Sequence, residues 1–199
     1  MVAADGGADS LGGTGVIPEA IIGDLDSLAC PDSWQSLTRL VYIAEQDTTD
    51  FEKCLYSVEA PLFIAVGFAG SRLDHTLASL HVLHRYIDKK SVLFMAGEDV
   101  CFAHHGNLQL TMQPGVRLSI FPLSETTFVA STGLEYPLNG LRLLSGELIG
   151  TSNRVTESEV SIHAVSGAYC IIVPMASLDT LISTVFRLPD GSVYAPNSE

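Results

Sequence analysis

The chain has 199 residues, of which 47% are hydrophobic and 17% are charged, and this composition excludes an intrinsically disordered protein. Its formal net charge of -13 argues against nucleic acid or an anionic membrane surface as a partner, because both need a dense basic patch. The sequence has neither a signal-peptide pattern nor an apolar run long enough to span a bilayer. We therefore expect a soluble, cytoplasmic protein.

The first half of the chain alternates short apolar runs with helical periodicity, which is the pattern of a βαβ sheet. The predicted strands are residues 2–4, 20–22, 40–44, 62–66 and 92–95. Thr49 and Glu52 form a capping box that predicts an amphipathic helix between the third and fourth strands. After the fourth strand we expect Asp74 to be the N-cap of a second helix, which runs to about residue 88.

These elements predict a Rossmann-like α/β domain with a mostly parallel sheet over residues 1–105. The predicted strand at residues 2–4 runs straight into a glycine-rich loop. A complete α/β domain would begin earlier, so we expect this domain to lack its first strand and helix.

The second half of the chain changes to a period of two from about Leu108, which is typical of half-buried strands. Turn signals separate the apolar runs at Pro114-Gly115, Asn139-Gly140, Ser145-Gly146 and Ser166-Gly167. This pattern predicts an all-β antiparallel sandwich over residues 106–199. The junction between the two domains is expected near residues 104–107.

Four polar segments directly follow predicted strands of the first half, at residues 5–7, 23–27, 47–50 and 67–74. Ligands in open α/β sheets bind at the carboxyl ends of the strands, so we expect these loops to converge on one edge. Their carboxylates repel one another and require a cation, and Mg²⁺ prefers such oxygen ligands. Asp24 and Asp26 are the best direct ligands, with Asp50 beside them. A plain surface turn is the alternative reading of the Asp-x-Asp pair.

Two basic residues accompany these carboxylates. Lys53 lies one helical turn after Asp50, where it either reaches a phosphate as a point charge or forms an ordinary ion pair along the helix. Arg72 follows Gly70 in a glycine-rich loop, where its guanidinium suits a phosphate group. Asp74 in the same loop is either a functional carboxylate or only a helix cap.

The ordered set of motifs resembles the thiamine pyrophosphokinase family, whose members move a pyrophosphoryl group from ATP to the thiamine hydroxyl and leave AMP. The resemblance spans most of the chain. It rests on Ala4-Asp5-Gly6-Gly7-Ala8, Ile22-Gly23-Asp24-Leu25-Asp26-Ser27, Gln46-Asp47-Thr48-Thr49-Asp50 with Lys53, Ser71-Arg72-Leu73-Asp74-His75, Thr132-Gly133-Leu134-Glu135-Tyr136-Pro137-Leu138 and Gly150-Thr151-Ser152-Asn153.

The resemblance implies an N-terminal α/β domain for ATP and Mg²⁺, a C-terminal β-domain, and a homodimer with thiamine bound between subunits. The positions that match the family's acidic metal and catalytic residues are Asp24, Asp26, Asp50 and Asp74. Those that match its nucleotide and phosphate contacts are Gln46, Lys53, Gly70 and Arg72. Those that match its thiamine-facing residues are Ser152 and Asn153.

The expected activity is that of an ATP:thiamine diphosphotransferase, in which positioning and charge neutralisation dominate. Some carboxylates hold the metal, and another accepts the proton of the attacking hydroxyl. We expect Asp74 or Asp50 to be nearer that second role than the Asp24 and Asp26 pair. Two alternatives stay open: a Mg²⁺-dependent phosphohydrolase built on Asp24 and Asp26, and a nucleotide or thiamine sensor without turnover.

Overall fold

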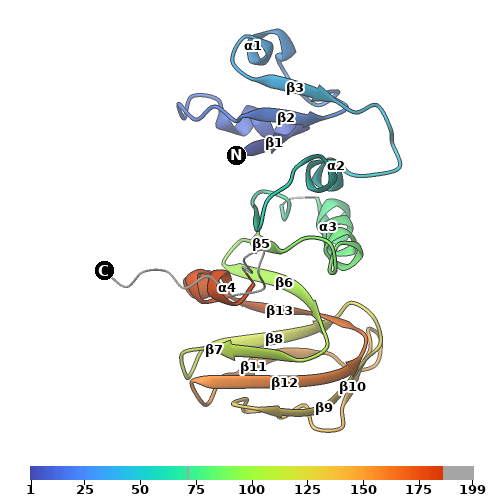
Figure 1. Ribbon diagram of the computed structural model, residues 1–199, viewed down its shortest axis with the longest axis vertical. Coiled ribbons are helices and arrows are strands. Elements are labelled where there is room, and N and C mark those ends of the chain that lie inside the picture. The colour runs from blue at the N-terminus through green and yellow to red at the C-terminus, as the bar shows by residue number, and fades with distance from the viewer. Residues whose placement is uncertain (71, 186–199) are drawn as a thin grey trace. The chain divides into compact units, whose positions relative to one another are not determined.

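The structure is a computed structural model that describes residues 1–70 and 72–185 (Figure 1). Ser71, which belongs to one of the motifs above, lies outside the described residues. The chain divides into two compact units, the first from Met1 to Ala60 and the second beginning at Pro61. Within the described ranges, none of the helices is long and apolar enough to cross a membrane.

The first unit is a parallel sheet with helical segments on both faces. Its strands are β1 (Val2–Ala4), β2 (Ala20–Gly23) and β3 (Arg39–Tyr42), in the order β1-β2-β3, and its helical segments are η1 (Asp5–Leu11), α1 (Pro31–Gln35) and α2 (Asp50–Ser57). All three strands are parallel, so their carboxyl ends lie at the same edge of the sheet.

All four residues of the central strand β2 are buried. Because successive side chains of a strand point to opposite sides, β2 is covered on both faces of the sheet. Ile21 packs with Ala8 of η1 and with Leu28 on one face of the sheet. Ile22 packs with Cys54 of α2 on the other face. These two small cores hold the carboxyl edge of the sheet in place between η1 and α2.

The second unit contains most of the strands. Its elements are β4 (Phe63–Ala65), α3 (Leu73–Arg85), β5 (Val92–Ala96), β6 (Asp99–His105), β7 (Leu108–Thr111), β8 (Arg117–Pro122), β9 (Thr126–Thr132), β10 (Arg142–Leu143), β11 (Gly150–Arg154), β12 (Glu159–Ser166), β13 (Ala168–Pro174), η2 (Met175–Ser177) and α4 (Leu178–Val185). They form a six-stranded sheet in the order β11-β8-β13-β6-β5-β4 and a four-stranded sheet in the order β10-β9-β12-β7.

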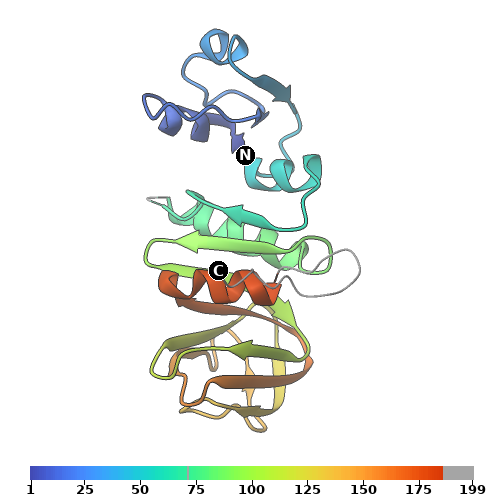
Figure 2. The same ribbon diagram turned by 60° about the vertical axis from the view of Figure 1, so that its left-hand side comes forward.

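The main core of the second unit lies between these two sheets. Buried side chains of the six-stranded sheet, such as Ile120 and Ile171, belong to one cluster with Phe128 and Ile162 of the four-stranded sheet. The helices α3 and α4 lie on opposite faces of the part formed by β5 and β6 (Figure 1, Figure 2). The coarse expectation of sheets with helices followed by a β-rich half is therefore confirmed.

The expectation of one mostly parallel sheet across the first half is wrong at β4 and β5. These two strands are parallel to each other, but the chain reverses direction at Gly97, after β5, and β6 pairs with β5 in an antiparallel ladder. Gly97 has a φ of +61°, which a tight hairpin turn of this kind requires. The hairpin joins β4 and β5 to the sheet of the later strands rather than to β1, β2 and β3.

The two predicted helix starts have different outcomes. At α2 the Thr49 side chain accepts a hydrogen bond from the Glu52 amide at 3.3 Å, which confirms this cap. At α3 the prediction that Asp74 is the N-cap is wrong, because the helix begins at Leu73 and Arg72 is the N-cap. Asp74 lies within the first turn, and its carboxylate instead pairs with the Arg72 guanidinium.

Candidate active site

Three carboxylates lie together at the carboxyl edge of the sheet in the first unit. Asp5 follows β1 directly, and Asp24 and Asp26 follow β2. One carboxylate oxygen from each residue lies within 4.8 Å of the others. Anions at this spacing repel one another unless a cation lies among them, and an all-oxygen donor set fits a hard divalent cation. We refer to these three residues as the acidic trio.

Asp5 is the most unusual member of the acidic trio. It is only 2% exposed and has a φ of +41°, in the left-handed region that few non-glycine residues adopt. Its Oδ2 accepts a hydrogen bond from the Ser27 amide at 3.3 Å, whereas Oδ1 has no hydrogen-bond partner within the part of the chain that the structure describes. Burial, aided by the neighbouring carboxylates, raises the pKa of Asp5 to about 6. A buried, unpartnered carboxylate oxygen of this kind fits a metal ligand.

Asp24 is held by donors from three directions. The side-chain amide of Gln46 donates a hydrogen bond to Asp24 Oδ2 at 2.5 Å, and the backbone amide of Asp26 donates to Asp24 Oδ1 at 3.4 Å. The Lys53 ammonium lies 3.6 Å from Oδ2. The hydrogen bond from Gln46 is the largest cause that lowers the pKa of the Asp24 carboxyl, so Asp24 is ionised at neutral pH.

Lys53 is buried within this acidic surrounding. It is 1% exposed, and its ammonium donates to Asp50 Oδ1 at 3.1 Å besides approaching Asp24. Burial lowers the pKa of the Lys53 ammonium, but the pairing with Asp50 and with Asp24 outweighs burial and leaves this pKa raised. Lys53 therefore stays charged and ties the start of α2 to the loop after β2.

The loop between β3 and α2 is shaped by Glu45. Its carboxylate accepts hydrogen bonds from the amides of Asp47 and Thr48 at 2.8 and 3.0 Å, and also from the Thr48 and Tyr56 hydroxyls. The hydrogen bond from Thr48 is the largest cause that lowers the pKa of Glu45. This fixed loop presents the neighbouring Gln46 to Asp24.

The second unit carries the remaining acidic and basic candidates. Arg72 and Asp74 form an exposed pair, with Nε to Oδ1 at 3.2 Å and Nη2 to Oδ2 at 2.6 Å. The hydrogen bond from Arg72 is the main cause that lowers the pKa of Asp74. Gly70 precedes this pair, and a methyl group added at Gly70 would meet no atom within 4 Å. Open space at this loop leaves room for a ligand.

The two residues expected to face thiamine lie in β11 and differ in exposure. Ser152 is exposed, and its amide donates to the buried Ser119 hydroxyl at 3.0 Å. Asn153 is 4% exposed, and its side chain is hydrogen-bonded to the backbone of Tyr136 and Arg154. Of this pair, only Ser152 is open to a ligand.

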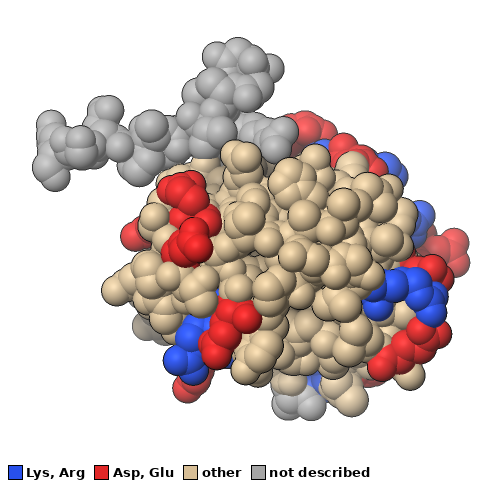
Figure 3. All heavy atoms as spheres, turned by 90° about the horizontal axis from the view of Figure 1, so that it is seen from below, with Lys and Arg blue, Asp and Glu red and all other residues tan. Residues whose placement is uncertain are grey.

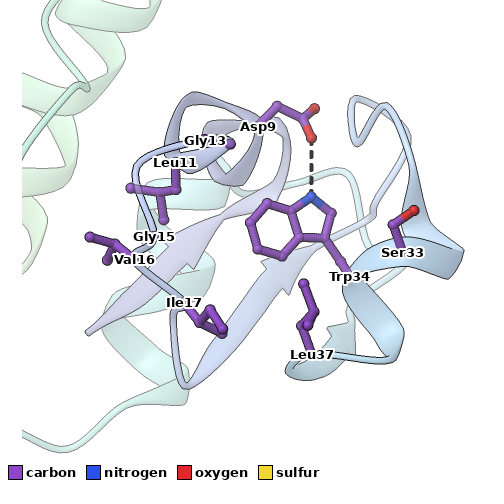
Figure 4. Close-up of a pocket in the computed structure, with 10 residues that line it drawn as sticks. Asp9, Leu11, Gly13, Gly15, Val16, Ile17, Ser33, Trp34 and Leu37 are labelled. Carbon is purple, nitrogen blue, oxygen red and sulfur yellow. Dashed lines mark hydrogen bonds between the residues drawn. The ribbon is translucent and has the colours of Figure 1, made fainter.

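A pocket of about 510 Å³ lies elsewhere in the first unit (Figure 4). It is lined by Trp34 and Leu37, by Leu11, and by the loop through Val16 and Ile17. The Trp34 indole donates to Asp9 at 3.2 Å, and the other Asp9 oxygen accepts from an amide. No residue of the acidic trio lines this pocket, so it is separate from the candidate metal site.

Known families match both parts of the chain. The family model described as "Thiamin pyrophosphokinase, catalytic domain" matches residues 1–95, and "Thiamin pyrophosphokinase, vitamin B1 binding domain" matches residues 107–178. Thiamin pyrophosphokinase 1 of Caenorhabditis elegans is 30% identical over 164 residues, which are 75% of this chain and 67% of that protein. The chain belongs to the thiamine pyrophosphokinase family.

Other thiamine pyrophosphokinases agree with this assignment. Thiamine pyrophosphokinase 1 of Arabidopsis thaliana is 30% identical over 169 residues, which are 74% of this chain and 62% of that protein. The crystal structure of thiamin pyrophosphokinase from Geobacillus thermodenitrificans has a TM-score of 0.73 and 26% identity, covering 87% of this chain and 85% of that one. The chain thus spans about two thirds of the length of its worm and plant relatives. Enzymes of this family are transferases that convert thiamine to its diphosphate.

Within the thiamine pyrophosphokinase fold, the first unit brings half of the expected residues together. Asp24, Asp26, Gln46, Asp50 and Lys53 form one connected set of hydrogen bonds and ion pairs. Gly70, Arg72, Asp74, Ser152 and Asn153 belong to the second unit. The sequence-based list of site residues missed Asp5, although Asp5 was recognised as following a strand. Asp50 had been expected in the place that Asp5 occupies beside Asp24 and Asp26.

Gly23 has no room for a side chain beside the acidic trio. A methyl group there would lie 2.7 Å from Asp5 Cβ and 3.1 Å from Asp50 Oδ1. We expect Gly23→Ala to lower the free energy of unfolding by about 1–3 kcal/mol, because Asp5 and the Asp50 carboxylate must shift. Chemical denaturation measures this loss. Gly7→Ala is the matched control, since its added methyl group meets nothing within 4 Å, and an equal loss in both variants would contradict the crowding at Gly23.

Proposed function

We propose that this chain transfers the pyrophosphoryl group of ATP to the hydroxyl of thiamine, giving thiamine diphosphate and AMP. The observation that carries the proposal is the acidic trio, in which a buried Asp5 oxygen, without a hydrogen-bond partner among residues 1–70 and 72–185, lies beside Asp24 and Asp26. Proteins of the α/β class bind nucleotides at the carboxyl edge of a parallel sheet, and the acidic trio lies at such an edge. Membership of the thiamine pyrophosphokinase family supports thiamine as the acceptor.

The acidic trio would hold Mg²⁺, with one or two direct carboxylates and the remaining positions left to water and phosphate oxygens. When bound, Mg²⁺ neutralises charge on the phosphate oxygens during transfer. Gln46 and Lys53 hold Asp24 in one orientation and keep it ionised. Asp50 is held by Lys53 next to the trio rather than within it, and we propose that it stays outside the direct ligand set.

The transfer itself needs correct placement of two oxygens. The thiamine hydroxyl oxygen attacks the β-phosphorus of ATP. The bond from that phosphorus to the oxygen between the α- and β-phosphates breaks, and AMP leaves with this oxygen. The hydroxyl proton passes to a carboxylate. We propose Asp50 for this role, because Lys53, which also approaches Asp24, holds Asp50 next to the acidic trio. Arg72 would then turn from Asp74 to the phosphates, for which its planar guanidinium is suited.

We also propose the division of labour that the sequence predicts. Residues 1–105 would supply the part that binds ATP and Mg²⁺, and residues 106–199 the part that binds thiamine. The matches at residues 1–95 and 107–178 support this division. The compact units divide earlier, at Ala60, because β4 and β5 pair with strands of the later half. The free cysteines of the described chain are consistent with the cytoplasm as its location.

We propose that the protein is a homodimer. In the face of the second unit seen from below, charged side chains lie mainly toward the periphery (Figure 3). Val129 of β9 and Val165 of β12 are 55% and 68% exposed on the four-stranded sheet. Exposed apolar side chains favour association. Light scattering should give about twice the chain mass of 21.2 kDa, and a monomer that retains full activity would contradict the proposal.

The activity is tested by incubating the purified chain with ATP, Mg²⁺ and thiamine and separating the products by chromatography. We expect AMP and thiamine diphosphate in equal amounts. Reactions without thiamine and reactions with excess EDTA are the controls, and both should release no AMP. Phosphate release without thiamine would indicate a phosphohydrolase, and thiamine binding without any product would indicate a sensor. Either result would contradict the proposed transfer.

A further inference from the structure

The acidic trio is carried by two segments of the chain, η1 and the loop between β2 and α1. Asp5 is the first residue of η1, and its Oδ2 accepts a hydrogen bond from the Ser27 amide of the loop at 3.3 Å. A methyl group added at Gly6 would lie 2.7 Å from the Ser27 carbonyl oxygen, so the two backbones are in close contact there. The position of Asp5 relative to Asp24 and Asp26 therefore depends on how η1 is held against this loop.

Asp9 connects η1 to the same loop a second time. Its Oδ2 accepts a hydrogen bond from the Ala29 amide at 2.9 Å, and its Oδ1 accepts one from the Trp34 indole of α1 at 3.2 Å (Figure 4). Hydrogen bonds to an ionised carboxylate are stronger than those between neutral groups. Each oxygen of Asp9 thus binds a donor of the chain, and Asp9 joins η1 both to the loop and to the helix that follows it.

Trp34 extends this connection to the small core between η1 and the sheet. Its ring packs against the cluster that contains Ala8 and Leu28, and the pocket of about 510 Å³ borders it as well (Figure 4). Packing therefore encloses the ring incompletely, and the hydrogen bond to Asp9 fixes its orientation. Leu25, which lies between the two aspartates of the loop, packs against the same cluster and has a φ of +60°. A non-glycine residue keeps that conformation only where its surroundings hold it.

We propose that Asp9 is a positioning residue for the metal site, and that its hydrogen bonds hold η1 and the loop after β2 at the separation at which the acidic trio can share one ion. This inference rests on the proposed function, which supplies Mg²⁺ as that ion. The three carboxylates repel one another, so they would move apart if the two segments were not tied together. Ligands that are already in place when the ion arrives bind it more tightly than ligands that must first be ordered.

The first test is calorimetric titration of the nucleotide-free chain with MgCl₂. Asp9→Ala removes both hydrogen-bond acceptors, and we expect it to raise the Kd for Mg²⁺ roughly tenfold, as removal of residues that support metal ligands commonly does. Asp9→Asn keeps one acceptor oxygen and should raise the Kd less. Asp32→Ala is the matched control, because it removes an exposed carboxylate of α1 that belongs to neither segment. Its Kd should stay close to that of the unaltered chain.

The second test shows whether Asp9 acts on the position of Asp5. The Ser27 amide donates to Asp5 and not to Asp9, so its hydrogen exchange reports the contact between η1 and the loop at the trio. In EDTA, we expect Asp9→Ala to speed the exchange of the Ser27 amide along with that of the Ala29 amide, as measured by NMR. Faster exchange at Ala29 alone would mean that the effect of Asp9 is local, and would overturn the positioning role.

Trp34→Phe is an independent variant, because it removes the indole donor but keeps an aromatic ring in the core. We expect it to raise the Mg²⁺ Kd less than Asp9→Ala does. In the Asp9→Ala background it should add little, since the two residues are partners in one hydrogen bond. Full additivity would overturn the part of the proposal that rests on this hydrogen bond.

The outcomes separate this inference from the proposed function. If Asp9→Ala lowers the thermal midpoint but binds Mg²⁺ as tightly as the unaltered chain, Asp9 only stabilises the fold, so the positioning role is overturned and the proposed function stands. If Asp9→Ala fails to fold, Asp9→Asn and Trp34→Phe decide, because each disturbs a single hydrogen bond, and an unchanged Mg²⁺ Kd in both overturns the proposal. If the unaltered chain does not bind Mg²⁺, the metal site of the proposed function fails, and the positioning role fails with it.

Discussion

Asp24→Asn is expected to reduce turnover by a factor on the order of a hundred or more. Asp24 belongs to the acidic trio and also accepts hydrogen bonds or ion pairs from Gln46, Asp26 and Lys53. The substitution keeps the size of the side chain but removes its charge and replaces an oxygen with a donor. Gln46 and Lys53 both approach Oδ2, so an asparagine oxygen in that place turns the new NH2 group toward the Asp26 backbone amide, and the metal loses a charged ligand.

This loss is measured by the initial rate of AMP release over a range of Mg²⁺ concentrations. We expect both a lower rate and a higher Mg²⁺ concentration for half-maximal activity. Asp32→Asn in α1 is the matched control, because Asp32 is an exposed carboxylate of the same unit and lies outside the trio. If Asp24→Asn keeps normal magnesium-dependent turnover, Asp24 is not a metal ligand.

Asp5→Asn is expected to abolish tight Mg²⁺ binding while making the metal-free protein more stable. The pKa of the Asp5 carboxyl is raised from 3.8 to about 6 by burial, so the folded chain loses stability as the pH rises from 3.8 to 6 and stays destabilised above pH 6. Asparagine avoids this cost, tolerates the left-handed φ of +41°, and can still accept from the Ser27 amide. We expect a gain of about 1–3 kcal/mol in the free energy of unfolding at pH 8.

The sign of the pH dependence follows from the direction of this shift. Below pH 3.8 the carboxyl is protonated in both the folded and the unfolded chain, so the two proteins should differ little there. The gain in the free energy of unfolding of Asp5→Asn over the unaltered chain should grow between pH 3.8 and 6 and stay constant above that range. Chemical denaturation of both proteins in EDTA at pH 5 and pH 8 measures this gain.

Metal addition provides the complementary measurement. Mg²⁺ should raise the thermal midpoint of the unaltered chain, because a ligand that binds only the folded state stabilises it. The midpoint of Asp5→Asn should not respond. A less stable Asp5→Asn protein with an unchanged response to Mg²⁺ would mean that the unpartnered oxygen has a structural role instead.

The sequence predicted the parts of the site that depend on short-range order. A strand followed by a polar loop identifies Asp24 and Asp26, and a capping box identifies the start of α2 with Asp50 and Lys53. Parallel strands then bring these loops to one edge. This reasoning needs only local patterns and the geometry of parallel sheets, so it succeeded for most of the first unit.

Other features depend on contacts that no local pattern reveals. The burial of Asp5 results from the packing of η1 and of the loop through Ser27, and that packing distinguishes it from an ordinary turn carboxylate. The hairpin at Gly97 has a weak turn signature, and it moves β4 and β5 into another sheet. The inward turn of Asn153 follows from a register shift in β11, which sequence periodicity does not indicate.

The way in which Asn153 holds residue 136 has a consequence for how this protein can change. The hydrogen bonds that fix the segment involve the backbone amide and carbonyl of Tyr136, and none of them involves its side chain. Any residue type except proline, which lacks the amide donor, can therefore be placed there without loss of these contacts. Position 136 is thus a place where selection or engineering can change an exposed side chain while the surrounding fold is preserved.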